Sequence, residues 1–293
     1  MPELPDVSVY VERLAAKIVG QRLERLQIGH PFLLRSVTPP ISAIEGRTVI
    51  GVERLGKRIV LAFEGDLFLV VHLMIAGRLR WLAPEKKPAA ANALAFLAFA
   101  TGTLVLTEAG KQRRASLHVV EGRAALAALD AGGIDVMTAT REAFAARLVA
   151  ENHTVKRALT DPRLFSGIGN AYSDEILHRA RLSPVALTRS LDEPAIDRLF
   201  AATTSTLADW TARLAREAGD WPQKVTAFHP AMAVHGRFGQ PCPDCGAPVQ
   251  RIVRADSETN YCARCQTGGK VLADRALSRL LKDSWPKQID ELL

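Results

Sequence analysis

Residues 242–265, CPDCGAPVQRIVRADSETNYCARC, contain all four cysteines of the chain: Cys242, Cys245, Cys262 and Cys265. Two C-x-x-C pairs with 16 residues between them have the spacing of a four-cysteine zinc ribbon, in which four thiolates complete a tetrahedron. Free or disulfide-bonded cysteines are the alternative, but they would not place every cysteine of a protein in this register. Because four thiolates leave no open position for water, we expect one structural Zn²⁺ that holds a β-hairpin over residues 250–261.

The charge of the chain favours a polyanionic partner. The 293 residues include 38 Lys and Arg against 31 Asp and Glu, which gives a net charge of +7 and a pI of about 9.5. Nucleic acid is the first candidate for such a partner and a membrane surface is the second. The predicted hairpin carries Arg251 and Arg254, so it could enter a groove of nucleic acid.

The segment before the cysteines predicts two helices joined by a glycine-rich turn. It reads TVKRALTDPRLFSGIGNAYSDEILHRA over residues 154–180. Gly167 and Gly169 let a ligand approach the backbone closely, and Asn170 precedes the free N–H groups of the second helix, which suit a phosphodiester. The alternative is a tight turn between helices with Asn170 as its cap. The nearby Lys156 and Arg157 favour the phosphate interpretation.

The rest of the chain changes from a strand pattern to a helix pattern near residues 132–140. Apolar residues alternate along 22–30, 48–63, 66–83, 93–108 and 114–120, which predicts an antiparallel sandwich. A short amphipathic helix is expected over residues 5–19, and helices are expected over 141–150 and 192–218. The fold class is therefore α+β, with strands first and helices after them.

We expect a cytoplasmic protein. The N-terminus carries Glu3 and Asp6 where a secretory signal would carry basic residues before an apolar run. The longest apolar stretches are about half the length that crosses a bilayer, so no membrane partner is expected. In a reducing compartment, cysteines serve metal binding or catalysis rather than disulfides.

The chain begins MPELPDV, and its second residue raises a chemical question. If Met1 is removed, Pro2 becomes a secondary amine, and attack on a sugar C1′ would give an iminium with no N–H proton to lose. That ion acidifies the C2′ hydrogen and permits elimination of the 3′ phosphate. Glu3 could transfer the protons, and Lys57, between two strands, could supply positive charge. The alternatives are an inert, disordered N-terminus, or a retained Met1 that leaves the Pro2 nitrogen as an amide.

Together these segments resemble the formamidopyrimidine-DNA glycosylase and endonuclease VIII family. The resemblance rests on MPELP, a lysine after a β-turn, HLMIAGRL, GIGN, and VHGRFGQPC before the four-cysteine hairpin. It implies a catalytic β-sandwich with a short N-terminal helix, a helix–two-turn–helix domain and a zinc finger. We place these at residues 1–135, 136–236 and 237–269, followed by a helical extension at 270–293 that could cover the finger or bind a partner.

The resemblance also implies an activity and a set of site residues. The expected enzyme is a bifunctional glycosylase and AP lyase that excises oxidised purines or pyrimidines from double-stranded DNA, acting as a monomer associated with the bacterial nucleoid. The alternative is a DNA-damage-binding relative without catalysis. The damaged nucleotide would be flipped out of the stack. The implied catalytic residues are the nucleophile Pro2, the general acid Glu3 and Lys57, a catalytic phosphate contact. The implied contacts to the DNA backbone are His72 and Asn170, and further DNA contacts are expected from Lys111, Arg113, Arg114, Lys156 and Arg254.

Several residues depart from the family pattern. Met74 replaces a glycine, and Ile75 stands where the family has a methionine that fills the space of the flipped base. The DPRRFG loop of the family is absent, and TEAGKQRRASL stands in its place. The hairpin arginine five residues before the third cysteine is Ser257, which Arg254 or Arg251 could replace. Judged without the resemblance, His72 in its apolar strand would be a core residue.

Overall fold

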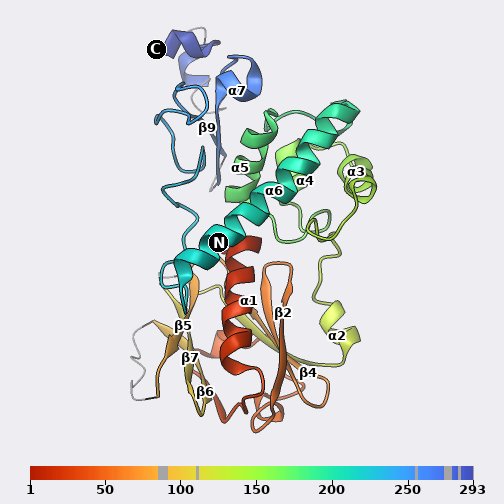
Figure 1. Cartoon of the computed structure of the whole chain (residues 1–293), viewed down its shortest axis with the longest axis vertical. Coiled ribbons are helices and arrows are strands. Elements are labelled where there is room, and N and C mark those ends of the chain that lie inside the picture. The colour runs from red at the N-terminus through yellow and green to blue at the C-terminus, as the bar shows by residue number, and fades with distance from the viewer. Residues whose placement is uncertain (85–91, 110–111, 255–256, 274–278, 283–284, 293) are drawn as a thin grey trace. The chain divides into compact units, whose positions relative to one another are not determined.

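The computed structural model describes residues 1–84, 92–109, 112–254, 257–273, 279–282 and 285–292 (Figure 1). The chain divides into two compact units. The first comprises Met1–Ala131 and Trp210–Thr226, and the second comprises Gly132–Asp209 and Ala227–Leu293. The long helix α6 (Glu193–Ala218) contributes residues to both units.

The first unit contains the helix α1 (Leu4–Ile18) and the strands of the predicted sandwich. Helix α1 has a proline in its first turn, and the Glu3 N–H donates a hydrogen bond of 2.9 Å to Asp6 Oδ2. Its apolar stripe is buried, which confirms the helix expected over residues 5–19. The strands are β1 (Arg25–Ile28), β2 (Val49–Leu55), β3 (Arg58–Phe63), β4 (Leu67–His72), β5 (Gly77–Leu82), β6 (Ala93–Phe99), β7 (Gly102–Glu108) and β8 (Ser116–Glu121).

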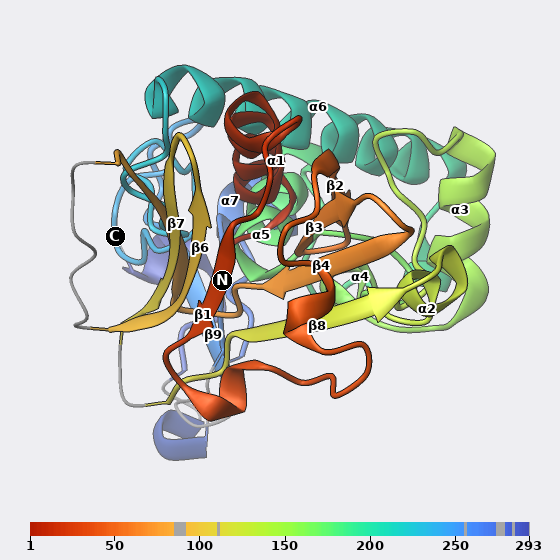
Figure 2. The same cartoon turned by 90° about the horizontal axis from the view of Figure 1, so that it is seen from below.

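These strands form two antiparallel sheets (Figure 2). Buried residues of both sheets belong to one hydrophobic core. Their strand orders, in the described residues, are β1-β6-β7-β5 and β2-β3-β4-β8. In β3, Ile59 and Leu61 face the shared core, while Val60 and Ala62 face a smaller cluster with Leu126 of α2 (Arg123–Ala127). This alternation is the two-residue period of a strand with both faces covered. The predicted N-terminal sandwich is confirmed.

The second unit begins with short helices around an aromatic cluster. The helices are α3 (Arg141–Ala150), α4 (Val155–Thr160) and α5 (Asn170–Ala180). The Phe144 ring centroid lies 4.7 Å from that of Phe165 and 5.4 Å from that of Phe200. Asp192 caps α6 by accepting a 2.9 Å hydrogen bond from the Ala195 N–H, so the helix expected over 192–218 is confirmed.

The cysteine-bearing segment forms the predicted hairpin. Strands β9 (Gln250–Arg254) and β10 (Ser257–Tyr261) pair antiparallel, and α7 (Ala263–Thr267) follows them. The C-terminal extension packs against this hairpin, because Val271 and Ile289 are buried in the same cluster as Tyr261. Residues 274–278, within the helix expected there, lie outside the described residues. Among the helices that the structure describes, none has the length and apolar character needed to span a bilayer.

Candidate functional site

The N-terminus of the first unit is packed into the protein. Pro2 is buried and Glu3 is 3% exposed at the start of α1. Burial lowers the pKa of the Met1 α-amino group, the negative charges of Glu3 and Asp6 oppose this shift, and the positive charges of Arg78 and Lys57 add to it. The start of the chain therefore lies among four ionisable side chains rather than in a disordered tail.

Lys57 is one of these side chains and lies in the turn between β2 and β3. The turn is possible because Gly56 adopts a left-handed conformation with φ of 62°. Burial lowers the pKa of Lys57, and the Glu3 carboxylate acts against that shift. The structure thus brings together the three residues that the sequence marked as catalytic, namely Pro2, Glu3 and Lys57.

Asp6 and Arg78 belong to the same cluster, and sequence reasoning gave neither a role. Burial raises the pKa of Asp6 to about 7, against the opposing effect of its hydrogen bond from the Glu3 N–H. Arg78 is fixed by hydrogen bonds from its guanidinium to the backbone oxygens of Val225 (2.8 Å) and Gly77 (2.7 Å). The sequence signal for Arg78 was its place in HLMIAGRL, a segment that supported the family resemblance without a role for its arginine.

His72 ends β4 and is half-buried. Burial lowers its pKa to about 4, and the positive charges of Arg58 and Lys57 contribute to the shift. A neutral imidazole can donate one hydrogen bond, so the phosphate contact expected of His72 stays a prediction.

The turn after His72 carries the two departures from the family pattern. Met74 adopts a left-handed conformation with φ of 52°, and the Ile75 side chain is 57% exposed. Gly77 tolerates no side chain, because a Cβ there would lie 2.2 Å from the Leu73 carbonyl oxygen. The exposed Ile75 is thus held on a turn with a fixed backbone.

The segment that replaces the family's loop is anchored by a buried carboxylate. Glu108 is 1% exposed and accepts hydrogen bonds from the N–H groups of Arg114 (2.9 Å) and Ala115 (3.0 Å). The side chains of Arg113 and Arg114 are exposed, and Arg114 also donates to Gln112. Lys111 lies outside the described residues. The DNA contacts expected of Arg113 and Arg114 stay predictions.

In the second unit, the position of Asn170 at the start of α5 differs from the one expected for a helix cap. Gly169 is the N-cap of α5 and Asn170 is its first helical residue, so the interpretation of Asn170 as a cap is wrong. Its Nδ2 instead donates a 2.8 Å hydrogen bond to the backbone oxygen of Glu258 in β10. This hydrogen bond forms because strand β10 of the hairpin packs against α5. The contact of Asn170 with the DNA backbone stays a prediction.

Lys156 is held inside the second unit. Its Nζ donates hydrogen bonds to Asp174 Oδ1 (2.5 Å), Ser173 Oγ (2.9 Å) and the backbone oxygen of Asn170 (3.0 Å). These bonds use all three hydrogens of the ammonium group. Asp174 is fully buried and also accepts from His235 Nδ1 (2.8 Å). Lys156 therefore orders the start of α5, and its direct contact with a phosphate stays a prediction.

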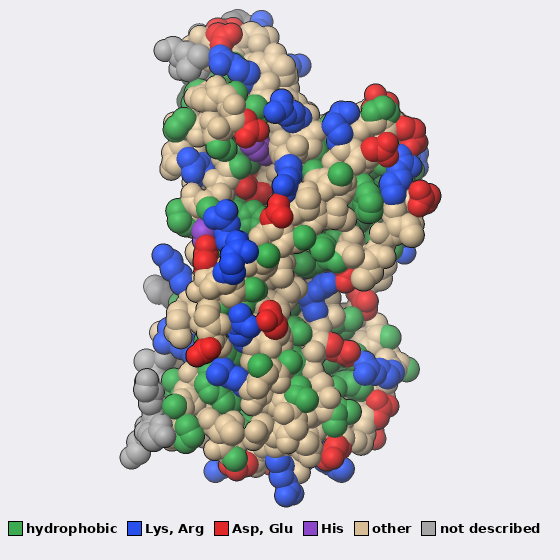
Figure 3. Space-filling model, viewed as in Figure 1, with side chains coloured by type: hydrophobic (Ala, Val, Ile, Leu, Met, Phe, Trp, Pro, Cys, Tyr) green, Lys and Arg blue, Asp and Glu red, His purple; other side chains and the backbone are tan. Residues whose placement is uncertain are grey.

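A basic pocket of about 230 Å³ lies between α4 and the hairpin. Arg254 lines it directly opposite Ser257 in the strand register. Arg251, by contrast, lies over the Phe238 ring at 4.2 Å and contacts Glu258 at 3.3 Å. Elsewhere, basic and acidic side chains are mixed on the face drawn in Figure 3. The described residues lining the pocket include no carboxylate; they are Thr154, Lys156, Arg157, Thr160, Pro184, Val185, Ile252, Arg254, Ser257 and Thr259.

The four cysteines converge at the base of the hairpin. The sulfur atoms of Cys242 and Cys265 are 3.9 Å apart, those of Cys245 and Cys262 are 3.4 Å apart, and all four lie within 4.8 Å of one another. A tetrahedron with Zn–S bonds of about 2.3 Å has S–S edges of about 3.8 Å, so these residues fit a zinc ion. His178 of α5, which sequence reasoning did not consider, lies 3.3 Å from Cys242 Sγ.

Three family models match the chain in succession. They describe a formamidopyrimidine-DNA glycosylase N-terminal domain (residues 1–117), a formamidopyrimidine-DNA glycosylase H2TH domain (134–214) and a zinc finger found in FPG and IleRS (239–268). A formamidopyrimidine-DNA glycosylase of Heliobacterium modesticaldum is 32% identical over 277 residues, covering 91% of this chain and all of the relative.

Solved structures agree with these matches. The MutM (Fpg) protein of Thermus thermophilus is 32% identical, with a TM-score of 0.75 over 90% of this chain and 98% of that one. The Lactococcus lactis Fpg in complex with FAPY-dG DNA has a TM-score of 0.81 at 23% identity, over 90% of this chain and all of that one. The latter supports the fold alone. Residues 269–293 lie beyond the last family match.

Proposed function

Since the chain belongs to the formamidopyrimidine-DNA glycosylase family and is a DNA repair glycosylase by that membership, we propose that Pro2 is its nucleophile. In this proposal the protein excises an oxidised base and then cuts the strand as an AP lyase. The observation that carries it is the buried cluster at the N-terminus, where Lys57 and Glu3 interact beside the start of the chain.

The proposed reaction uses the amine that Met1 removal would release. The Pro2 nitrogen bonds to C1′, the damaged base leaves with the C1′–N bond electrons and a proton, and the sugar ring opens to an iminium. Loss of the C2′ proton sends electrons toward that iminium and expels the 3′ phosphate; a second elimination expels the 5′ phosphate. In this proposal Glu3 protonates the ring oxygen, and Lys57 offsets negative charge. Burial, Arg78 and Lys57 lower the pKa of the Met1 α-amino group against the effect of Glu3 and Asp6, and we propose that the same surroundings act on the Pro2 amine once Met1 is removed.

Damaged double-stranded DNA is the proposed partner, and the second unit is proposed to bind its backbone. Arg254 is the leading candidate for a phosphate contact, because it lines a pocket without carboxylates among the described residues. Arg157 lines the same pocket. We propose His72, Arg113, Arg114 and Asn170 as further contacts and assign one structural Zn²⁺ to the four cysteines. The zinc would fix the hairpin and take no part in the bond-breaking steps.

Borohydride trapping tests the proposal. The purified protein is incubated with duplexes containing an abasic site, 8-oxoguanine or an oxidised pyrimidine. After reduction, the mass of the N-terminal peptide is measured by mass spectrometry. A covalent adduct on a terminal Pro2 is expected, and the lesion trapped best would identify oxidised purines or oxidised pyrimidines as the substrate class. Pro2→Gly should lose strand cleavage while it retains DNA affinity.

A catalytically inactive DNA-damage-binding relative is the second candidate. A retained Met1 would favour it, because the Pro2 nitrogen would then be an amide that cannot attack C1′. Absence of an adduct on every duplex, in protein whose mass proves that Met1 is gone, would contradict the lyase proposal. Tight binding to damaged duplexes in that case would support the alternative.

A further inference from the structure

Helix α5 directs a buried histidine at the sulfur cluster. His178 is 4% exposed, and its Nε2 lies 3.3 Å from the sulfur of Cys242, which is itself 3% exposed. The same Nε2 is 3.9 Å from Asp244 Oδ2, which is beyond hydrogen-bond distance. A ring nitrogen of His178 also lies within 4.8 Å of the Cys265 sulfur. The imidazole therefore lies beside the four sulfur atoms and contacts one of them, that of Cys242.

Four thiolates around one Zn²⁺ leave a net charge of −2, and this charge is buried at the base of the hairpin. An N–H group that donates to one thiolate disperses part of that charge, and hydrogen bonds to ionised acceptors are stronger than neutral ones. Groups that donate to metal ligands commonly change metal affinity by about 10–100-fold. The geometry of His178 is that of such a donor.

We propose that His178 donates an Nε2–H hydrogen bond to the Cys242 thiolate and thereby holds the zinc ion more tightly and slows its release. This inference rests on the proposed zinc site. A role as a zinc ligand is not required, because the four sulfur atoms already have tetrahedral spacing. His178 is a positioning residue that acts through Cys242.

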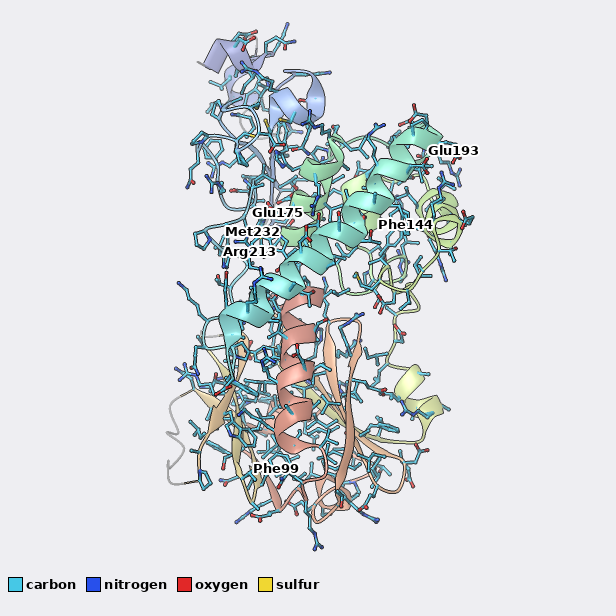
Figure 4. All side chains as sticks on the ribbon, viewed as in Figure 1. Phe99, Phe144, Glu175, Glu193, Arg213 and Met232 are labelled. Atoms are coloured by element: carbon cyan, nitrogen blue, oxygen red, sulfur yellow. The ribbon has the colours of Figure 1, made fainter. Side chains whose placement is uncertain are left out.

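The neighbours of His178 on α5 support this interpretation. Asp174 accepts a hydrogen bond from the Asn260 N–H (3.1 Å), and Glu175 accepts from the N–H groups of Val234 (2.9 Å) and His235 (3.0 Å). Figure 4 shows Glu175 beside Met232, in the segment that leads to the cysteines. These carboxylates bind the segments that come before and after the first C-x-x-C turn. The contact of His178 with Cys242 likewise joins α5 to one of the four cysteines.

The test compares two variants of the full-length protein. His178→Phe keeps a ring but removes the N–H donor, whereas His178→Gln changes the shape but keeps an N–H donor. The control is His153→Phe, since the His153 ring pairs with a carboxylate, that of Glu151, rather than with a cysteine. Zinc release to a coloured chelator is followed over time, and each protein is also loaded with Co²⁺ so that the sulfur-to-cobalt charge-transfer bands can be recorded.

We expect His178→Phe to release zinc about 10–100-fold faster and to shift the charge-transfer bands to lower energy, because the sulfur lone pairs lose a hydrogen bond. His178→Gln should retain most of the wild-type behaviour, and His153→Phe all of it. Equal release from the wild type and His178→Phe, or equal loss in both His178 variants, would overturn the inference. A wild-type cobalt spectrum with a nitrogen ligand would also overturn it. Failure of the wild type to bind Zn²⁺ or Co²⁺ at all would overturn the zinc assignment first.

Discussion

Replacing Asp174 with asparagine tests the buried charge network of the second unit. Asp174 is fully buried, its Oδ1 pairs with Lys156 Nζ at 2.5 Å, and the Lys156 side chain is only 12% exposed. Its Oδ2 accepts from His235 Nδ1 and the Asn260 N–H. Asp174→Asn keeps the shape but leaves the Lys156 charge buried without its counter-ion. Removing one partner of such a pair costs about 3–5 kcal/mol, so we expect a loss of that size in the stability of the second unit.

The assay combines urea unfolding of the zinc-loaded protein with hydrogen exchange of the Asn260 amide, which reports on the hairpin directly. The matched control is Asp209→Asn, which breaks an exposed pair with Arg179 and should cost less than about 1 kcal/mol. The double variant Lys156→Met/Asp174→Asn should recover part of the loss, because it removes the unpaired cation. A cost below about 1 kcal/mol for Asp174→Asn, with unchanged exchange at Asn260, would refute the reasoning.

Three further predictions follow from single contacts. Ile289→Ala should destabilise the second unit by about 2–5 kcal/mol in thermal unfolding, because Ile289 is 1% exposed in the hairpin core, whereas Leu280→Ala at 77% exposure should have little effect. Burial raises the pKa of Asp6 from 3.8 to about 7, so the folded state holds this proton more tightly than the unfolded state. The free energy of unfolding should therefore fall as the pH rises from about 4 to about 7. Asp6→Asn should remove this dependence on pH in urea unfolding. Arg254→Ala should weaken DNA binding and reduce the slope of log K against log salt by about 0.9 in titrations, whereas Arg251→Ala should change it less because Arg251 is already engaged by Phe238 and Glu258.

Local patterns predicted the fold better than they predicted the contacts of the site. The cysteine spacing predicted the hairpin, and the alternation of apolar residues predicted the sandwich, because both depend on residues that are close in the sequence. The role of Asn170 as a cap was wrong because Gly169 took that position and the amide found a partner in β10, 88 residues away. Arg78 was missed for a similar reason, since its partner Val225 is 147 residues away. The raised pKa of Asp6 depends chiefly on burial, which no local pattern reports.

One signal of the hairpin contact was nevertheless present in the sequence of α5. Asn170, Asp174 and His178 are spaced four residues apart, so they lie along one face of a helix. Asp174 and His178 are buried, and polar residues on a buried helix face require partners. Each of the three contacts the cysteine-bearing segment: Asn170 binds the Glu258 oxygen, Asp174 the Asn260 N–H, and His178 the Cys242 sulfur. A polar stripe at helical spacing thus predicts that a second polar segment packs on that face, and the periodicity alone could have located the contact surface before its partner was known.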